Sequence, residues 1–580
     1  MSRQSGVSFS TSNLLIVLLS VFTLAFQDEA NAQSGMFTNP VLRGGYPDPS
    51  ICRVGDDFYI VNSSFEYFPG LPLHHSKDLV NWELVGYGLH REEQVTGAVN
   101  LVDVQSNGGI HAPTLRCRDG QFYIITTNVY LPQGDHATTQ FVNFVITAKN
   151  IEGPWSEPHV IEGAPGIDPD LFFDDDGRVW YVGTHTPDNP NFPGEGEIWL
   201  HELDPDSWEL RGKRYFLWRG ACGGEWAEGP HLYKRDGRYY LLVAEGGTSF
   251  NHAVTVAVSD DITGPYHSNP RNPILTSRHL GYDFWVNSTG HADIVELADG
   301  RWYMVALGIR GDEDRSSNMG RETHVIPMTW QREPFEWKET RYLWPVVAPL
   351  TGRVERNTPL PFRNKPQVRR NEFVDDFAGD SLKLDWNFRR FPMPGTYSLT
   401  ARSGFLRLHA KPGVIEERGR ASLVGVRQTE SDFEYRAKMQ FSPKQDDVEA
   451  GVVLFQKDNK YLGFTVRRNG NVEELQIVLA QPNSAPTIIE RAEIEGYGGD
   501  IVFRVVSIDS KYEFAYSLDH GNSFKAFGET RANHILAHGS YTGAYLGLYT
   551  TSNGAESVEY ADFDWIRYNA NERISVHPSQ

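Results

Sequence analysis

Three carboxylates and two histidines occupy matching positions in five similar segments of the chain. Each precedes, by eleven or twelve residues, an aromatic side chain within a short apolar run. The five residues are Asp48, His111, Asp168, Glu228 and His291. If one structural unit repeats, these side chains meet at one place, and carboxylates that meet can act as a general acid and a general base. The pattern therefore predicts a hydrolytic active site.

The three carboxylates suit the hydrolysis of a glycosidic bond. That reaction needs a protonated carboxyl group, which donates to the leaving oxygen, and an ionised carboxylate, which activates water or attacks carbon. Glu228 has the longest reach and lies near Trp226, whose ring favours a neutral acid. Asp48 lies between two prolines that fix the backbone, which makes it the better candidate for the ionised base. Asp168 can raise the pKa of the acid by its charge and can hydrogen-bond the sugar.

Short strands must bring these residues together. The segments recur at intervals of about 60 residues, a period typical of propeller blades or solenoid units. Between residues 36 and 347, aromatic and β-branched runs alternate with DG, GG, PG and NP turns, and convincing amphipathic helices are absent. Five blades closed into a ring place equivalent residues at one end of the central axis. We therefore predict a five-bladed β-propeller over residues 36–347.

A second β-rich domain follows the propeller. Five prolines lie between Pro345 and Pro366, and we expect residues 348–372 to form a linker. Residues 373–570 contain alternating apolar and polar strands such as GVVLFQ and GAYLGLYTT, a pattern typical of a β-sandwich. The expected fold class is all-β, a five-bladed β-propeller followed by a β-sandwich of the jelly-roll, concanavalin-like type.

Composition and charge limit the choice of partners. The chain has 580 residues and a formal net charge of −21. This charge disfavours nucleic acid and anionic membranes as partners, because both require a basic face. A neutral or cationic ligand fits better, and the sequence does not fix the oligomeric state.

The first residues have the features of a signal peptide. Arg3 precedes an apolar run from Leu14 to Phe26, and the stretch ANA at residues 30–32 resembles a signal-peptidase site. The apolar run is shorter than the roughly 18 to 20 residues that a spanning helix needs. We therefore expect residues 1–32 to be removed during export to the periplasm or the outside of the cell.

The cysteines do not form a disulfide framework. The chain has three, Cys52, Cys117 and Cys222. Cys52 and Cys117 fall on neighbouring inner strands of the predicted propeller and could form a bridge. The alternative is that they are buried free thiols.

Several motifs in order along the chain resemble glycoside hydrolase family 43. They are YPDPSI, GIDPDLFFDDDG, EGPHLY, TGHADIV and GRETHVIPMTW. The stretch SSFEYFPGLPLHHSKDLVNWELVG and the carboxy-terminal sandwich are similar to those of the β-xylosidase and α-L-arabinofuranosidase members. The resemblance covers nearly the whole mature chain.

The resemblance implies roles for the three carboxylates and a substrate. Asp48 matches the general base of the family, Glu228 the general acid, and Asp168 the residue that tunes the pKa of the acid and orients the sugar. The family inverts the anomeric centre. The resemblance therefore implies an inverting, exo-acting glycosidase, a β-xylosidase, an α-L-arabinofuranosidase or both, which acts on xylo-oligosaccharides or arabinose-substituted plant glycans.

The resemblance also implies a sugar-binding set around the carboxylates. Arg321 matches an arginine that contacts the substrate, and Phe65 matches an aromatic wall. Tyr541 matches an aromatic residue that the second domain pushes toward the active site, which would shorten the cleft into a pocket. His111 departs from the family, since related xylosidases often have an aromatic residue before Ala-Pro, and we expect it to line the pocket. His291 matches a histidine near the axis.

No cofactor is required by this chemistry, but structural calcium is an open expectation. In relatives, the histidine that His291 matches helps to hold a central calcium ion or a water cluster. Asp376 and Asp562, near the two ends of the sandwich, could share a structural calcium ion as in similar sandwiches.

Two other functions stay open from the sequence. The protein could be a carbohydrate-binding propeller without catalysis, although binding alone does not need three converging carboxylates. It could also be a retaining glycosidase or transglycosylase of a related five-bladed type, with Asp48 as the nucleophile. The sequence does not distinguish xylose from arabinose, because both pentoses offer similar hydroxyl groups.

Overall fold

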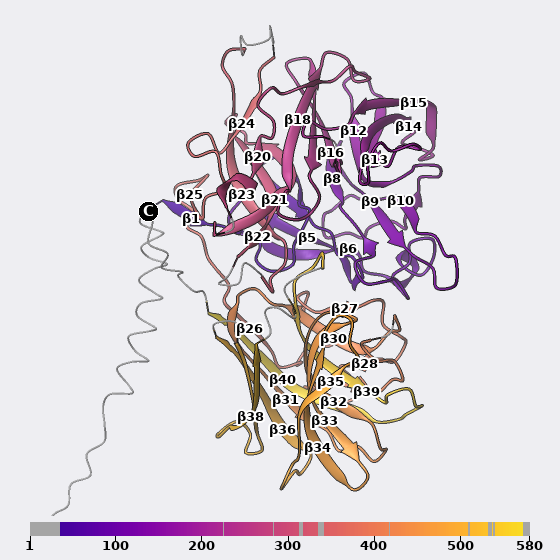
Figure 1. Cartoon of the computed structure of the whole chain (residues 1–580), viewed down its shortest axis with the longest axis vertical. Helices are drawn as coiled ribbons and strands as arrows, with labels where there is room; N and C mark the ends of the chain where they lie inside the picture. Colours follow the sequence, from indigo (N-terminus) through magenta and orange to yellow (C-terminus); the bar gives the residue numbers. More distant parts are fainter. Residues whose placement is uncertain are drawn as a thin grey trace, which may run out of the picture.

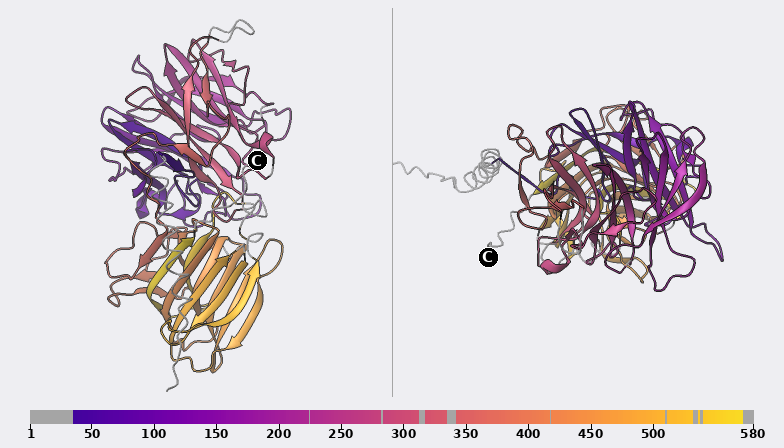
Figure 2. Two further views of the ribbon diagram at one scale, coloured as in Figure 1. Left: turned by 90° about the vertical axis from the view of Figure 1, so that its left-hand side faces the viewer. Right: turned by 90° about the horizontal axis from the view of Figure 1, so that it is seen from above.

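The computed structural model describes residues 35–571 except 224, 282, 312–316, 335–341, 417, 509–510, 532–535 and 537–539. The predicted signal peptide, residues 1–32, lies outside the described residues. The described elements are nearly all strands, beside the single-turn 3-10 helices η1 (Glu92–Gln94) and η2 (Arg278–Leu280). In this part of the chain no helix is long and apolar enough to cross a membrane. Two domains stack on each other, with the propeller above the sandwich (Figures 1 and 2).

The amino-terminal domain is a five-bladed β-propeller, which confirms the predicted fold class. Each blade is one antiparallel sheet of strands that follow one another in the chain, except that β4 (Tyr67–Phe68) lies outside blade 1. Blade 1 contains β2 (Ser50–Val54), β3 (Asp57–Val61), β5 (Gly70–Ser76) and β6 (Glu83–Leu89). Blade 2 contains β7 (Gly109–Ile110), β8 (Thr114–Arg118), β9 (Gln121–Tyr130), β10 (Gln140–Ala148) and β11 (His159–Val160). Blade 3 contains β12 (Ile167–Phe173), β13 (Val179–His185), β14 (Glu197–Leu203) and β15 (Leu210–Trp218).

The last two blades complete the ring. Blade 4 contains β16 (Glu228–Arg235), β17 (Arg238–Glu245), β18 (Ala253–Ser259), β19 (His267–Ser268) and β20 (Leu275–Thr276). Blade 5 contains β21 (Val286–Glu296), β22 (Trp302–Arg310), β23 (Glu322–Trp330) and β24 (Pro345–Val347). The inner strands β2, β8, β12, β16 and β21 contact one another in turn, and β21 contacts β2, so the ring closes.

The repeated aromatic residues hold the blades together. In each blade they lie on the strand that pairs with the inner strand. Trp180, Tyr240 and Tyr303 are buried there in clusters that include residues of a neighbouring blade. Burying such a side chain contributes about 1.5–3 kcal/mol. The aromatic period seen in the sequence is therefore the period of the packing between blades.

The carboxy-terminal domain is a β-sandwich of two large antiparallel sheets, with its main core between them. One sheet has the order β28 (Tyr397–Ser398), β29 (Leu406–His409), β40 (Tyr560–Asn571), β31 (Asp432–Gln440), β36 (Asp500–Ile508), β37 (Lys511–Ser517) and β38 (Lys525–Arg531), with β26 (Glu372–Asp375) paired to β40. The other has the order β35 (Thr487–Glu493), β34 (Val472–Ala480), β33 (Lys460–Asn469), β32 (Glu449–Lys457), β39 (Tyr545–Thr551), β30 (Ser422–Arg427), β27 (Asn387–Arg389) and β4 (Tyr67–Phe68).

The last of these strands comes from the propeller. β4 pairs with β27, so one sheet of the sandwich continues into the amino-terminal domain. The ring of Tyr67 stacks on Tyr545 with 4.1 Å between ring centres, and its hydroxyl donates to the backbone oxygen of Gln456 at 2.9 Å. The two domains therefore share hydrogen-bonded backbone as well as packed side chains.

The connector between the domains is also bound to the propeller. β25 (Asn357–Pro359) pairs with β1 (Met36–Thr38), and the side chain of Gln367 makes two hydrogen bonds with the backbone of Thr38, at 2.9 and 3.0 Å. The connector is therefore bound to the surface of the propeller and is not a free linker.

The cysteines of the propeller are free thiols. Cys52 on β2 and Cys117 on β8 lie on neighbouring inner strands, as expected, and neither forms a disulfide. Of the two alternatives that the sequence left open, free thiols are the one observed.

Candidate active site

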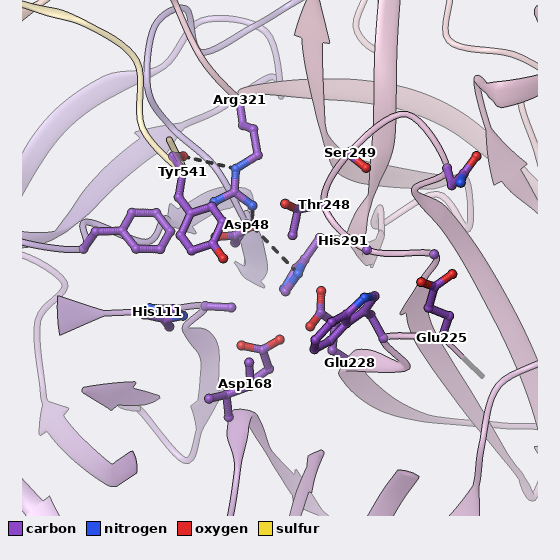
Figure 3. Close-up of a pocket in the computed structure, with 17 residues that line it drawn as sticks. Asp48, His111, Asp168, Glu225, Glu228, Thr248, Ser249, His291, Arg321 and Tyr541 are labelled. Atoms are coloured by element: carbon purple, nitrogen blue, oxygen red, sulfur yellow. Dashed lines mark hydrogen bonds and ion pairs between the residues drawn. The ribbon is translucent and has the colours of Figure 1, made fainter. Parts of the chain in front are cut away.

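The five repeated segments converge on a pocket of about 400 Å³ at one end of the propeller axis (Figure 3). All eight side chains that the sequence predicted to catalyse or to bind substrate line it. They are Asp48, Phe65, His111, Asp168, Glu228, His291, Arg321 and Tyr541. Seven come from the propeller, and Tyr541 comes from the sandwich loop that precedes β39, drawn in yellow in Figure 3.

Irregular backbone aims the polar side chains at the axis. The pairing register shifts in β12, β16 and β21, beside Asp168, Glu228 and His291. Asp48, Asp168 and His291 also have positive φ angles of 50°, 55° and 44°. Such backbone costs about 1–3 kcal/mol per residue and clusters at functional sites, and bulges re-aim side chains there. The same local device thus recurs in several blades.

Asp48 is buried and ionised. Burial alone would raise its pKa, but the positive charge of Arg321, the imidazole of His291 and the hydroxyl of Ser63 together hold the pKa below its usual value. Arg321 donates through Nη1 to Oδ1 at 3.1 Å, and Ser63 donates to Oδ2. His291 Nδ1 lies 3.8 Å from Oδ1. Asp48 is therefore a carboxylate at neutral pH and can accept a proton.

Asp168 and Glu228 have the opposite electrostatics. Burial is the main cause that raises both pKa values, the charge of Asp48 adds to both, and the charge of Glu228 adds to that of Asp168. The pKa of Glu228 rises to about 7, and that of Asp168 lies well above its usual value. Oδ2 of Asp168 accepts from the backbone N–H of Gly229 at 3.2 Å. The two carboxyl groups together hold a proton at neutral pH.

The three carboxylates face one space. In Figure 3 Asp48, Asp168 and Glu228 point into the pocket from three sides, and His291 lies between Asp48 and Glu228. Burial lowers the pKa of His291 to about 4, so its ring is neutral. An ionised acceptor thus faces a proton-bearing pair across a polar gap, which is the arrangement that acid–base catalysis needs.

Arg321 connects Asp48 to the sandwich. While Nη1 holds Asp48, Nε donates to the backbone oxygen of Tyr541 at 3.1 Å. The guanidinium lies 5.5 Å from the ring centre of Phe65 and 5.1 Å from that of Tyr541. This side chain is buried and lines the pocket.

Aromatic rings close one end of the pocket. The ring centre of Phe65 lies 5.0 Å from that of His111 and 5.3 Å from that of Tyr541. Burial lowers the pKa of His111 to about 4, so this ring is also neutral. Asn107 of the propeller holds the sandwich loop, since its Oδ1 accepts from Ser540 Oγ at 3.0 Å and from the backbone N–H of Tyr541 at 3.2 Å.

The other end of the pocket is open. Trp226 also lines the pocket, with 48% of its surface exposed. Glu225 and Ser249 lie on the side of the pocket away from Tyr541 (Figure 3). Two glycines clamp the indole edge. A Cβ at Gly194 would lie 2.8 Å from the ring, and one at Gly247 would lie 3.1 Å from it. The two glycines hold the ring of Trp226 in place. The sequence did not identify Trp226 as a site residue.

The predicted calcium ligands do not fit the ion as they are placed. Among the described residues, no group of three or more His, Cys, Asp or Glu side chains could hold a metal. Asp562 is paired with Arg402 at 3.2 Å and with Arg407 at 2.7 Å, and Asp376 is exposed. Beside His291, the carboxylate of Asp48 already binds a guanidinium and a hydroxyl. Calcium takes about six to eight oxygen ligands, and the predicted residues do not offer such a set where they lie.

A second polar layer follows further along the inner strands. It takes one residue from each blade, namely Ser50, Arg116, Asp170, His231 and Asp293. Arg116 bridges Asp170 at 2.8 Å and Asp293 at 3.2 Å, and Ser50 donates to Asp293 at 2.7 Å. These bonds tie the inner strands together around the axis and so support the candidate catalytic residues, which lie two or more positions earlier in the chain.

The sequence contains a signal for this layer that was missed. In DPS, DPD and HAD the third residue points to the same side of a strand as the first. A polar residue two positions after a catalytic one, inside an apolar run, therefore marks a second ring.

Two family models match the chain. Residues 37–334 match glycosyl hydrolases family 43, and residues 374–569 match the β-xylosidase C-terminal concanavalin A-like domain. A xylosidase/arabinosidase of Butyrivibrio fibrisolvens is 39% identical over 541 residues, which cover 91% of this chain and 98% of the relative. A non-reducing end α-L-arabinofuranosidase of Bacteroides ovatus is 35% identical over 537 residues, which cover 92% of this chain and 94% of the relative.

Solved structures agree over both domains. A xylan β-1,4-xylosidase from Bacillus halodurans superposes with a TM-score of 0.83 at 31% identity, covering 92% of this chain and all of that one. A family 43 protein of the Bacteroides ovatus xyloglucan PUL gives a TM-score of 0.80 at 33% identity with the same coverage.

Proposed function

The chain belongs to glycosyl hydrolase family 43 and is a glycosidase, and we propose that it removes terminal pentose residues from plant glycans with inversion of configuration. The observation that carries this proposal is the electrostatic split in the pocket. Asp48 has a lowered pKa, whereas Asp168 and Glu228 have raised ones. Three converging carboxylates with divided roles favour catalysis over a binding propeller.

In the proposed mechanism Asp48 takes a proton from a water molecule, which attacks the anomeric carbon. Glu228 donates a proton to the leaving oxygen, and its pKa of about 7 allows it to be protonated before the reaction and to lose the proton readily during it. We propose that the proton of the pair lies on Glu228 when substrate is bound, because only Glu228 then meets the leaving oxygen. Asp168 in its charged form keeps it there and orients the sugar.

The shape of the pocket supports exo action. Phe65, His111 and Tyr541 close one end, so a chain cannot continue past the sugar bound there. At the open end the exposed face of Trp226 can stack on the unit that leaves. We propose that the closed end takes the terminal sugar and the open end takes the leaving group.

The names of two relatives support a pentose as the sugar that is released. One is named a xylosidase/arabinosidase, and another a non-reducing end α-L-arabinofuranosidase. We propose that β-xylosides and α-L-arabinofuranosides are both substrates, in xylo-oligosaccharides or arabinose-substituted glycans. Export of the enzyme by the segment 1–32 is part of this proposal, and amino-terminal sequencing of the secreted protein would test it.

One experiment tests activity and mechanism together. Hydrolysis of an aryl β-xyloside and of an aryl α-L-arabinofuranoside is followed by proton NMR, which identifies the anomer formed first. Inversion gives α-xylose and β-L-arabinose before mutarotation. If the first product keeps the configuration of the substrate, Asp48 acts as a nucleophile and the retaining alternative is correct. If the enzyme hydrolyses neither glycoside, the proposal that its substrates are pentosides is rejected.

A further inference from the structure

The sandwich has a pocket of its own, of about 210 Å³, which shares no residue with the active site. It lies on the sheet that includes β32, β33, β34 and β39, in the lower domain of Figure 1. Along β33 the residues Leu462 and Phe464 belong to the core between the sheets, whereas Gly463 and Thr465 line the pocket. Because side chains alternate along a strand, this sandwich pocket is on the outer face of the sheet.

The floor of the sandwich pocket is buried and polar. Glu449 accepts from Thr465 Oγ at 3.1 Å and from Gln476 Nε2 at 2.6 Å. All three residues are buried, and burial raises the pKa of Glu449. Burying a carboxyl group and an amide on a sheet face costs free energy that apolar residues would avoid. A face built only for packing has no reason to contain them.

The walls of the sandwich pocket are aromatic. Tyr461 and Tyr549 are each 5% exposed, and the hydroxyl of Tyr461 donates to the carboxylate of the exposed Glu416. Arg467 adds a cationic donor to the same lining. Ring faces beside fixed donors and acceptors are the lining that binds a neutral polyhydroxylated ring, in which apolar C–H faces alternate with hydroxyl groups.

The size of the sandwich pocket limits its ligand to one unit. Its volume is about half the roughly 400 Å³ of the active site, which must hold the terminal sugar and part of the leaving group. A polymer backbone cannot be enclosed in that space, but the end of a branch can.

We propose that the sandwich pocket is a second carbohydrate-binding site, which holds a terminal sugar of the branched polysaccharide on which the active site works. The class of ligand rests on the proposed function. Binding at this site keeps the enzyme on the polysaccharide between hydrolytic events, and it predicts no effect on small aryl glycosides.

Gly463 allows the site to be filled without damage to the sheet. Its backbone is not in the left-handed region, and a Cβ there would meet only ordinary contacts, 3.8 Å from Val478 and 4.0 Å from Tyr461. Valine is favoured in strands and would project into the pocket. Gly498, a sandwich glycine outside the pocket with no atom within 4 Å of its Cβ position and no left-handed φ, supplies the matched control Gly498→Val.

Affinity electrophoresis of the full chain tests the site. The parent protein contains Asp48→Asn so that it cannot degrade the polysaccharide, and native gels contain soluble arabinoxylan, arabinan or xyloglucan. We expect at least one polysaccharide to retard the parent. Gly463→Val should weaken that retention by about tenfold, Glu416→Ala should weaken it less, and Gly498→Val should leave it unchanged.

Kinetics with Asp48 restored separate this site from the active site. Gly463→Val should keep the kcat/KM of wild type on aryl glycosides and lose kcat/KM on the retaining polysaccharide. The inference is overturned if no polysaccharide retards the parent, or if Gly463→Val and Glu416→Ala are both retained like the parent. Absence of aryl-glycoside turnover in wild type would instead reject the proposed function, whatever the gels show.

Discussion

Three carboxyl groups acquire different properties in this pocket because their polar partners differ. Asp48, Asp168 and Glu228 are all buried, and burial raises the pKa of each. Asp48 alone receives a direct hydrogen bond from Arg321, at 3.1 Å, together with one from Ser63. These contacts outweigh burial at Asp48 and not at the other two. The proposed division into base and acid therefore depends on the hydrogen-bond partners of each carboxyl group and not on how deeply it is buried.

Arg321→Gln should move both limbs of the pH profile of kcat/KM to higher pH. Asp48 must be ionised, so activity falls as the pH drops through its pKa, and removing the positive charge raises that pKa. Arg321 also lowers the pKa of Glu228, so its loss shifts the basic limb in the same direction. We expect shifts of about one pH unit and a lower kcat/KM.

The control for this variant is Arg353→Gln, whose guanidinium pairs with Glu355 on the surface at 2.8 Å. Its profile should match that of wild type. An acidic limb that stays in place in Arg321→Gln would show that Arg321 does not set the ionisation of Asp48.

Glu228→Gln should affect substrates according to their leaving group. A glutamine cannot donate a proton, so kcat/KM on xylobiose should fall about 10²–10⁴-fold. Aryl glycosides with an acidic phenol need little protonation and should lose much less. The two rates are measured with the same enzyme preparation, and equal losses on both substrates would remove Glu228 from the role of acid.

Trp226→Ala should weaken the binding of the leaving unit. The exposed indole face lies at the open end of the pocket, where a second sugar can stack. Loss of one stacking contact should lower kcat/KM on xylobiose about tenfold and spare an aryl glycoside with a small leaving group. A matched change away from the site is Phe216→Ala, which removes an aromatic ring that is 54% exposed on β15. A loss that is the same for both substrates would contradict the assignment.

At the scale of elements, the regular features were predictable and the irregular ones were not. The aromatic residue of each second strand and the alternation of the sandwich strands follow from burial, so they leave a period in the sequence. The bulge beside Glu228 and the positive φ of Asp168 leave no such period. They depend on contacts between blades that only the closed ring provides.

The strand β4 shows why one element escaped prediction. Tyr67 and Phe68 lie inside the first blade in sequence, yet they pair with β27, more than 300 residues later. A two-residue strand has no periodicity of its own. Tyr541 was found only through the family resemblance, because no local pattern tells that a sandwich loop reaches a propeller axis.

A close backbone approach positions the loop of Tyr541, and Gly543→Ala should displace it. A Cβ at Gly543 would lie 2.2 Å from the backbone oxygen of Met319, so the loop must move. We expect kcat/KM on aryl glycosides to fall about tenfold or more and the melting temperature to fall by several degrees.

Tyr541→Ala distinguishes position from stability in the same loop. It removes the ring and keeps the backbone, so turnover of small substrates should fall while the melting temperature stays near that of wild type. The control is Gly498→Ala, because a Cβ at Gly498 would lie in open space and the φ of Gly498 is not left-handed. This change should alter neither turnover nor the melting temperature. Gly554 is not a suitable control position because its φ is +88°. Wild-type kinetics in both loop variants would mean that Tyr541 does not complete the pocket.

At the scale of the whole molecule, the propeller and the sandwich form the pocket together, because Tyr541 of the sandwich lines it beside the propeller residues. Ion pairs also join the two domains, since Arg310 binds Glu322 of its own blade at 2.6 Å and Glu430 of the sandwich at 2.8 Å. Arg43 binds the same Glu430 at 2.8 Å. Removing the sandwich would take Glu430 away from both arginines, and among the described residues only Arg310 would keep a carboxylate partner, Glu322 of its own blade.

Truncation tests this view, and the position of the cut matters. A chain that ends at Val347 lacks β25, so β1 loses its partner strand. A second chain, which ends at Asn364, is therefore designed to keep β25. Both lose β27 and the sandwich residues that bury the ring of Tyr67, and exposing this ring costs about 1.5–3 kcal/mol. Both also lose Tyr541 from the pocket and the acceptor for Arg321 Nε.

We therefore expect both truncated propellers to be poorly soluble, and the soluble fraction of the longer one to lose more of its kcat/KM on aryl pentosides than full-length Tyr541→Ala does. The comparison is informative because Tyr541→Ala removes only the ring, whereas truncation also removes the β4–β27 pairing and the partner of Arg310. Circular dichroism and melting curves show whether the loss reflects folding or the site. If the chain that ends at Asn364 folds cooperatively and turns over aryl pentosides at the rate of the full-length enzyme, the propeller is an independent catalytic domain and the sandwich contributes only to binding.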